Sequence, residues 1–360
     1  SIKNTSEKPN DQDYFTIGLF IPLCGSAGIW SPSCIACPEL AIDEINLAGG
    51  ISGKNIRVQL VDAAIETCDK IEQITDQIIE NSEISAIVGM HISAIRQKLS
   101  KIILGRVPFI YTPLYEGNEK TPGIYALGET PDNQLHPALE YLSKKLKVSK
   151  WAFIGNDYVW PRTSHAHAKQ FLENKNYKIA FEKYVDFGLN KFEPILDEIV
   201  KSGADAVLVS LVGQDLIDFN RAFGARKLHE NIIRLSGALE ENGLLAIGAR
   251  NSKNLYSTAS YFSNIPTARN QLFKENYYNL HGENAPSLNT LGQSIYEGIH
   301  FLAALIDEVG LEESCNLNDF KQPLSYNSIR NIRYKNNQDI QQTVYLAETK
   351  GIHFHNIIRL

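Results

Sequence analysis

Short apolar runs and amphipathic stretches alternate along most of the chain. Apolar runs of strand length recur at residues 15–23, 56–61, 84–89, 108–111, 151–155, 179–185, 206–212, 232–235 and 257–262. Stretches with apolar positions at helical spacing follow them, at residues 37–47, 69–80, 94–104, 137–146, 164–174, 192–202, 216–225, 239–248, 267–278 and 291–309. Strict alternation of this kind predicts parallel sheets with helices on both faces. After residue 309 the pattern changes, and antiparallel strands are predicted at residues 329–335, 342–349 and 352–358.

Two consecutive series of this alternation meet near residues 128–136, which predicts two similar lobes. A chain of 360 residues is also too long for one ordinary core. We therefore expect an α/β protein with two doubly wound parallel-sheet lobes. No low-complexity linker separates the halves, so short crossovers are expected to act as a hinge, with the ligand in the cleft between the lobes.

Composition limits the partners and the compartment. The net charge of −6 carries no electrostatic footprint for nucleic acid, and the apolar runs are too short for a bilayer, so direct membrane insertion is not expected. Residues 1–14 are expected to form a disordered leader, since they are polar and lack the apolar core of a signal peptide. Two histories fit this start: an exported protein has lost its signal peptide, or a cytoplasmic chain has lost its first Met.

The sequence contains no recognisable catalytic or cofactor motif. Neither a nucleophile elbow, a P-loop, a GxGxxG fingerprint nor an HExxH motif occurs, so we expect no enzyme activity, no cofactor and no metal ion. The five cysteines are an odd number, which leaves at least one unpaired unless it bridges two chains. Cys34 and Cys37 form a CxxC at a predicted helix start, where a thiolate would be stabilised. Packing cysteines or an adventitious disulfide is the favoured interpretation of this pair.

The segment 153–162 has the order strand, polar turn, helix. In open α/β sheets, small ligands bind in the crevice beyond the carboxyl ends of the strands, which this turn would border. Tyr158 and Trp160 are expected to close over the ligand, because an aromatic ring offers a flat apolar wall with a polar tip. Asp157 would bind an ammonium or amide NH2 group, or alternatively cap the following turn.

Several strings in the sequence match a known family. They are Ile17-Gly18-Leu19-Phe20, Ala41-Ile42-Asp43-Glu44-Ile45-Asn46, Gly49-Gly50-Ile51-Ser52-Gly53-Lys54, Ala86-Ile87-Val88-Gly89, Tyr115-Glu116-Gly117, Gly155-Asn156-Asp157-Tyr158-Val159-Trp160-Pro161-Arg162 and Ser260-Tyr261-Phe262-Ser263. With them the chain resembles the type I periplasmic binding-protein superfamily, from residue 17 to about residue 358. The strings at 115–117 and 155–162 are narrower and resemble the branch of urea- and short-chain-amide-binding proteins. That branch includes ABC-transporter receptors and the amide sensor of an aliphatic amidase operon.

The resemblance implies a fold and a function. Three crossovers near residues 134, 260 and 328 would join lobe 1, residues 15–134 plus 261–328, to lobe 2, residues 135–260 plus 329–360. The chain would be a solute-binding protein that captures a small polar ligand (urea, an amide or an amino-acid-like molecule) by hinge closure and presents it to an ABC-transporter permease. It would then be periplasmic or otherwise extracytoplasmic. The alternative is a ligand sensor of the amide-sensing type, which acts on a regulator protein or kinase and fits a cytoplasmic location.

Strand ends in lobe 1 supply the first candidate ligand contacts. Ser93 occupies a predicted N-cap position, and the resemblance carries ligand contact onto it, whereas a plain helix cap is the alternative. His91 is interpreted either as a half-buried histidine satisfied by the backbone or as a pH-sensitive ligand contact. Tyr111 would supply a wall, and Thr112 would bond an amide group. Sensor-like relatives have a Thr next to a Pro in this loop, but Pro113 is followed by Leu, which removes a hydroxyl.

Strand ends in lobe 2 supply the other candidates. Gly213 and Gln214 follow the apolar run 206–212 and are expected to face the cleft. In amino-acid-binding relatives an acidic residue from this lobe meets the α-ammonium group. Glu240 in the cleft would therefore favour an amino acid or amine over neutral urea. Glu116, in contrast, is expected to fix the loop that follows Tyr111.

Overall fold

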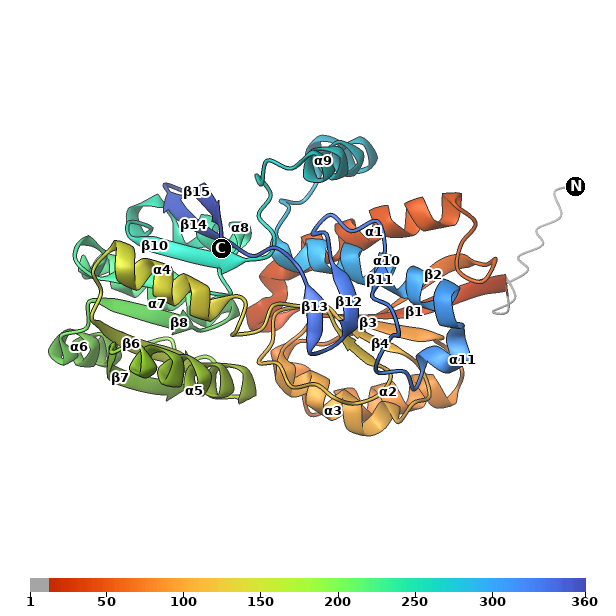
Figure 1. Cartoon of the computed structure of the whole chain (residues 1–360), viewed down its shortest axis with the longest axis horizontal. Helices are drawn as coiled ribbons and strands as arrows, with labels where there is room; N and C mark the ends of the chain where they lie inside the picture. The colour runs from red at the N-terminus through yellow and green to blue at the C-terminus, as the bar shows by residue number, and fades with distance from the viewer. Residues whose placement is uncertain (1–12) are drawn as a thin grey trace, which may run out of the picture.

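The computed structural model describes residues 13–360, in which two halves lie side by side (Figure 1). The predicted leader at residues 1–14 lies outside the described residues apart from its last two positions. Within the described part, no helix is long and apolar enough to cross a membrane.

The first half is a parallel sheet of five strands in the order β2-β1-β3-β4-β5. The strands are β1 (Tyr14–Ile21), β2 (Asn55–Asp62), β3 (Ala86–Gly89), β4 (Phe109–Tyr111) and β5 (Ile124–Ala126). Helices cover both faces, with α1 and α10 above the sheet and α2 and α3 below it in Figure 1. Their bounds are α1 (Ser31–Leu47), α2 (Ile71–Glu80), α3 (Ser93–Ile103) and α10 (Thr290–Val309). Because both faces are covered, β3 is buried along its whole length.

The second half repeats this order and extends it. Its seven strands run β15-β14-β10-β9-β8-β6-β7, and β14 and β15 are antiparallel additions to five parallel strands. The strands are β6 (Lys150–Asn156), β7 (Lys178–Val185), β8 (Ala206–Ser210), β9 (Ile233–Ser236), β10 (Leu255–Ala259), β14 (Tyr345–Lys350) and β15 (His353–Arg359). The helices of this half are α4 (Leu135–Lys145), α5 (Val159–Asn174), α6 (Glu193–Ser202), α7 (Gly213–Ala225) and α8 (Glu241–Ile247). The predicted α/β fold with two doubly wound parallel sheets is confirmed.

Further helices and 3-10 turns connect these elements in the described part of the chain. They are the helices α9 (Ala268–His281) and α11 (Leu311–Ser314) and the 3-10 turns η2 (Gly25–Trp30), η3 (Ile65–Thr67), η4 (Leu228–Glu230), η5 (Ala249–Asn251) and η6 (Gly282–Asn284). Helix α1 begins at Ser31, so Cys34 and Cys37 lie inside the helix and not at its start. Both are free thiols, and burial raises the pKa of each. Burial therefore favours the neutral thiol, and of the two favoured interpretations the structure fits packing cysteines and not a disulfide.

A third, small sheet differs from the sequence expectation. Its strands β11 (Leu324–Ser325), β12 (Arg333–Asn336) and β13 (Asp339–Gln341) pack on the first half, although residues 329–341 were expected in lobe 2. Asn337 holds it there, because its Oδ1 accepts from Ala126 N at 2.9 Å and its Nδ2 donates to Ile124 O at 2.8 Å. The chain therefore passes to the second sheet after β13 and not near residue 328. Of the predicted C-terminal strands, only the last two pair with each other.

A buried arginine joins the segments that connect the halves. Arg330 Nη1 donates to Ser260 Oγ at 2.6 Å and lies 3.7 Å from Glu129 Oε1. Glu129 in turn accepts from Ser260 N at 3.0 Å. Arg330 Nε also donates to Gln293 Oε1, and Nη2 donates to the Thr290 carbonyl. Three separate stretches of chain that run between the halves are thus fastened together with helix α10.

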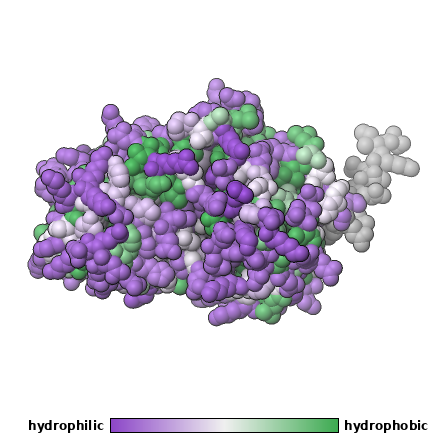
Figure 2. Space-filling view, in the orientation of Figure 1, coloured by the Kyte–Doolittle hydropathy of each residue, from purple (hydrophilic) through white to green (hydrophobic). Residues whose placement is uncertain are grey.

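The molecular surface is mostly hydrophilic on the face drawn in Figure 2. A hydrophobic patch interrupts it left of centre, over the C-terminal strands β14 and β15 and beside α4. A groove of about 390 Å³ lies here, with Leu146, Tyr256, Leu346 and Ile358 among its lining residues. This groove belongs to the second half alone and is distinct from the cleft between the halves.

Candidate ligand-binding site

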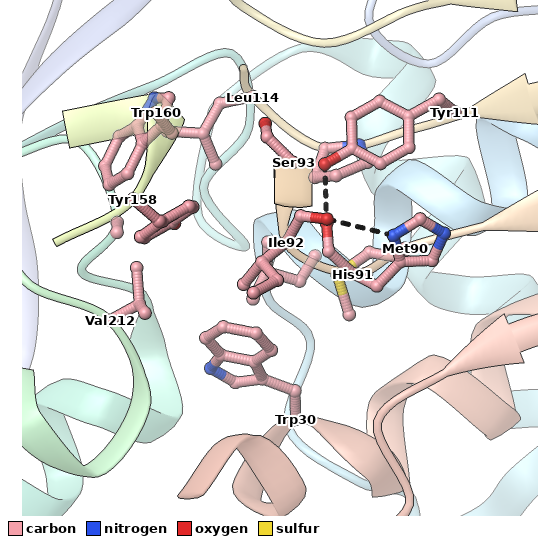
Figure 3. Close-up of a pocket in the computed structure, with 13 residues that line it drawn as sticks. Trp30, Met90, His91, Ile92, Ser93, Tyr111, Leu114, Tyr158, Trp160 and Val212 are labelled. Atoms are coloured by element: carbon pink, nitrogen blue, oxygen red, sulfur yellow. Dashed lines mark hydrogen bonds between the residues drawn. The ribbon is translucent and has the colours of Figure 1, made fainter. Parts of the chain in front are cut away.

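The carboxyl ends of β3 and β4 face those of β6, β8 and β9 across a small cavity of about 40 Å³ (Figure 3). Open α/β sheets of this strand order hold ligands at this edge, where the winding reverses. The lining residues come from both halves: Trp30, Met90, His91, Ile92, Ser93, Tyr111, Pro113, Leu114, Tyr158, Trp160, Val212, Ala238 and Leu291. Most of them are apolar.

The turn after β3 places His91 beside the cavity, with its ring packed against residues of β4. Its ring packs against Phe109 at 5.9 Å and Tyr111 at 5.2 Å between centroids. Nδ1 lies 3.2 Å from the Ile92 carbonyl, and Nε2 has no hydrogen-bond partner among the described residues. Burial lowers the pKa of His91 to about 3, so the ring is neutral near pH 7. This favours the backbone-satisfied interpretation over a pH-sensitive ligand contact.

Ser93 lines the cavity as the first residue of α3, while Ile92 is the N-cap. Its side chain therefore does not occupy the predicted cap position. The hydroxyl donates to Glu116 Oε2 at 2.7 Å and accepts from Arg96 Nη1 at 3.1 Å. Arg96 also pairs with Glu119. The loop after β4 is thus fastened to α3 through Glu116, as the sequence predicts.

The turn after β4 contributes one wall of the cavity. The Tyr111 hydroxyl donates to the His91 carbonyl at 2.6 Å, which fixes the ring. Pro113 and Leu114 follow in the wall. Thr112 lies outside the wall, because its hydroxyl pairs with Ser294 Oγ on α10 at 2.8 Å. The side chain of Thr112 thus serves the packing of β4 on α10.

The second half supplies the opposing aromatic wall. Tyr158 is the N-cap of α5 and Trp160 lies in its first turn, with ring centroids 6.4 Å apart. Figure 3 shows both rings with Val212 on one side of the cavity, and Ser93 and Tyr111 on the other. Asn156 fixes this wall, since its Oδ1 accepts from Val212 N at 2.9 Å. The two loops that face the first half are therefore bound to each other.

Two predicted polar contacts point to other partners. Asp157 is exposed and pairs with Arg162 Nε at 2.6 Å, so it lies outside the cavity wall. Gln214 Nε2 donates to Asp218 Oδ1 on the exposed side of α7. The structure does not bring either side chain to the cavity.

Gly213 and Glu240 lie near the cavity but serve the surrounding structure. Gly213 adopts φ 56° at the start of α7, and an added Cβ would lie 2.6 Å from the Ser26 carbonyl of the other half. Glycine is required there because the halves approach backbone to backbone. Glu240 caps α8, accepting from Asn242 N at 2.7 Å and Gly243 N at 2.8 Å. Its carboxylate therefore meets main-chain donors at the position where the sequence allowed a ligand ammonium group.

Apolar lining residues were missed in the sequence. Met90, Ile92, Leu114 and Val212 lie in the predicted strand ends but were not named as contacts, and Trp30, Ala238 and Leu291 were not predicted at all. Val212 ends an apolar strand run and directly precedes the predicted contact Gly213, so its place in the sequence already indicated a position at the cavity. Trp30 and Leu291 carry no such signal, because they reach the cavity from η2 and α10 through the tertiary fold.

The electrostatics of the cavity favour a ligand oxygen that accepts hydrogen bonds. The N-terminal residues of α3, α5 and α7 line it, through Ser93, Trp160 and Val212. First-turn amides of a helix lack intrahelical partners, and the helix dipole adds positive potential there. Over residues 13–360 no cluster of His, Cys, Asp and Glu that could hold a metal ion occurs.

The sequence model described as "Periplasmic binding protein" matches residues 15–351 of the chain. The chain belongs to the periplasmic binding protein family. Membership in this family makes it a binding protein and not an enzyme. No match was found among curated protein sequences.

Solved structures share the fold of this periplasmic binding protein. The transporter substrate-binding protein LivJ from Streptococcus pneumoniae, in complex with isoleucine, is 18% identical, with a TM-score of 0.80 over 96% of this chain and 99% of that one. An ABC-transporter solute-binding protein from Rhodopseudomonas palustris, in complex with p-hydroxybenzoic acid, is 16% identical, with a TM-score of 0.83 over 96% and 97%. A periplasmic binding protein from Burkholderia mallei is 14% identical, with a TM-score of 0.84 over 96% and 94%. At these identities the likeness concerns the fold alone.

Proposed function

We propose that this periplasmic binding protein captures a small solute in the cavity between its halves and delivers it to an ABC-transporter permease outside the cytoplasm. The observation that carries the proposal is the cavity itself, whose walls come from the strand ends of both sheets. The structurally similar proteins from Streptococcus and Rhodopseudomonas are described as transporter binding proteins, which supports the proposed role in transport.

The ligand we propose is a short-chain amide or a small amino acid. A cavity of about 40 Å³ has room for only a few water-sized groups, at roughly 10–15 Å³ for each. Its apolar walls favour a ligand with a small hydrocarbon part, which urea lacks. The helix N-termini at the cavity favour a carbonyl or carboxylate oxygen at the polar end.

The division of the walls between the two halves supports closure over the ligand. Ser93 and Tyr111 belong to the first half, and Tyr158 and Trp160 belong to the second. A ligand that contacts both halves binds the closed form more tightly than the open one, and so shifts the population toward it. The permease would then recognise the closed form.

A thermal-shift experiment tests this function. The panel contains urea, acetamide, propionamide, glycine, L-alanine and benzoate, and a binder raises the melting temperature by mass action. We expect a shift with propionamide or L-alanine and its loss in Tyr158→Ala. Gln214→Ala is the matched control, because Gln214 also lies at a helix start of the second half but outside the cavity. No shift with any compound, or a shift that Tyr158→Ala leaves unchanged, would overturn the proposal.

A further inference from the structure

A charged network is buried directly behind the cavity wall. Arg96, Glu116 and Glu119 are 3%, 5% and 8% exposed, so water does little to screen them. Arg96 Nη2 lies 2.7 Å from Glu116 Oε1, and Nε lies 3.1 Å from Glu119 Oε1. Two carboxylates meet one guanidinium, so the network carries net negative charge. Burial of ion pairs is costly and is weak evidence for a stabilising role.

The network determines which way the Ser93 hydroxyl points its proton. A serine hydroxyl has one proton and two lone pairs. The Glu116 carboxylate can only accept, so the Ser93 proton goes to it at 2.7 Å. Arg96 can only donate, so it occupies one lone pair of the same oxygen at 3.1 Å. One lone pair remains for a ligand in the cavity that Ser93 lines.

The Tyr111 hydroxyl, the second one in the wall, also gives its proton to a protein acceptor. Tyr111 donates its proton to the His91 carbonyl at 2.6 Å, and a carbonyl can only accept. The Tyr111 oxygen therefore has no proton to give to a ligand. Hydrogen-bond donors for a ligand oxygen come instead from main-chain amides at the start of α3.

We infer that Glu116 and Arg96 are positioning residues that hold the Ser93 hydroxyl as an acceptor, so that the site selects ligands with an N–H donor beside a carbonyl or carboxylate oxygen. The inference rests on the proposed function and narrows it. Amides and amino acids satisfy both requirements. A plain carboxylate does not, because its second oxygen would face the lone pairs of Ser93 and Tyr111.

Replacing Glu116 by glutamine reverses the direction of its hydrogen bond with Ser93 without changing the shape of the side chain. The carboxamide nitrogen of Glu116→Gln can donate to the Ser93 oxygen, which frees the Ser93 proton for a ligand oxygen. Glu119→Gln is the matched control, since it removes the same charge from the same arginine but makes no contact with Ser93. The pair of variants separates proton direction from net charge and from loop packing.

The experiment is isothermal titration calorimetry of the full chain with propionamide and propionate. We expect the wild type and Glu119→Gln to bind propionamide at least about tenfold more tightly than propionate. In Glu116→Gln the ratio falls below about threefold, chiefly because propionate binds better. Ser93→Ala is a second variant for the case that Glu116→Gln fails to fold. It is expected to weaken propionamide binding about tenfold and leave propionate unchanged.

Each other outcome contradicts the inference in a recognisable way. An unchanged ratio in Glu116→Gln, with propionamide still bound, overturns the role of Glu116 and leaves the proposed function standing. An equal fall in both glutamine variants assigns the selectivity to net charge and overturns the proton argument. Failure of both compounds to bind the wild type overturns the proposed ligand class together with the inference.

Discussion

Replacing Arg330 by methionine is expected to destabilise the protein where its two halves are connected. Arg330 is 4% exposed. Its side chain contacts Glu129, Ser260, Gln293 and the Thr290 carbonyl. Methionine fills much of the volume but leaves these acceptors without their donor. Breaking a buried ion pair from one side costs about 3–5 kcal/mol, because the remaining charge stays buried and uncompensated.

The structure places the expected loss at the lower end of that range. Glu129 keeps one hydrogen bond after the substitution, from Ser260 N at 3.0 Å. We therefore expect Arg330→Met to lower the free energy of unfolding by about 3 kcal/mol. Urea unfolding at pH 7, followed by tryptophan fluorescence and circular dichroism, measures it. Coincident transitions from the two probes justify a two-state analysis.

A surface arginine provides the matched control. Arg162 pairs with Asp157 at 2.6 Å, but the two side chains are 55% and 42% exposed. Arg162→Met is expected to cost less than about 1 kcal/mol, since exposed ion pairs contribute little. A loss below about 1 kcal/mol for Arg330→Met as well would refute the role of this arginine in fastening the connecting segments. The double variant Glu129→Gln with Arg330→Met is expected to recover part of the loss, because no unpaired charge remains.

Two further predictions follow from buried groups near the cavity. Burial raises the pKa of Glu240 from 4.5 to about 7, so the folded chain holds a proton that the unfolded chain releases, and stability falls as the pH rises from about 4.5 to 7. Glu240→Gln is expected to reduce this pH-dependent change in the free energy of unfolding by at most about 3 kcal/mol. Urea unfolding at several pH values measures it, and the same pH dependence in the variant and the wild type would contradict the prediction. Gly89→Ala places a Cβ 2.9 Å from the Phe109 ring and 2.5 Å from His91 Nε2. We expect it to cost about 1–3 kcal/mol in the same assay, and a neutral result would show that the rings can shift freely.

The sequence predicted the parallel core because each central strand is a continuous apolar run. β8 is buried at every position, and a run such as residues 206–212 is recognisable without tertiary information. β5, with three residues, was missed, although the equally short β4 was predicted. The small third sheet was misplaced. Its position depends on Asn337 side-chain bonds to β5 and on Tyr334 packing against Tyr125, which no local pattern reveals.

The position of the candidate site was predictable from the sequence, but the direction of its hydrogen bonds was not. Strand ends and aromatics located Ser93, Tyr111, Tyr158 and Trp160, which the structure brings together around one cavity. The partner that takes the Ser93 proton lies 23 residues away in sequence, so the hydroxyl direction was beyond local reasoning. Asp157 instead pairs with Arg162 in the helix that follows it, and spacing alone does not distinguish such a pair from a ligand contact.

A crystal structure of the protein with propionamide tests the central claim most directly. We expect electron density for the amide between Tyr158 and Ser93, in contact with both halves. The amide oxygen is expected to accept from a main-chain amide at the start of α3, and its nitrogen to donate to Ser93 Oγ. Propionamide bound outside this cavity, or held by one half alone, would contradict the account.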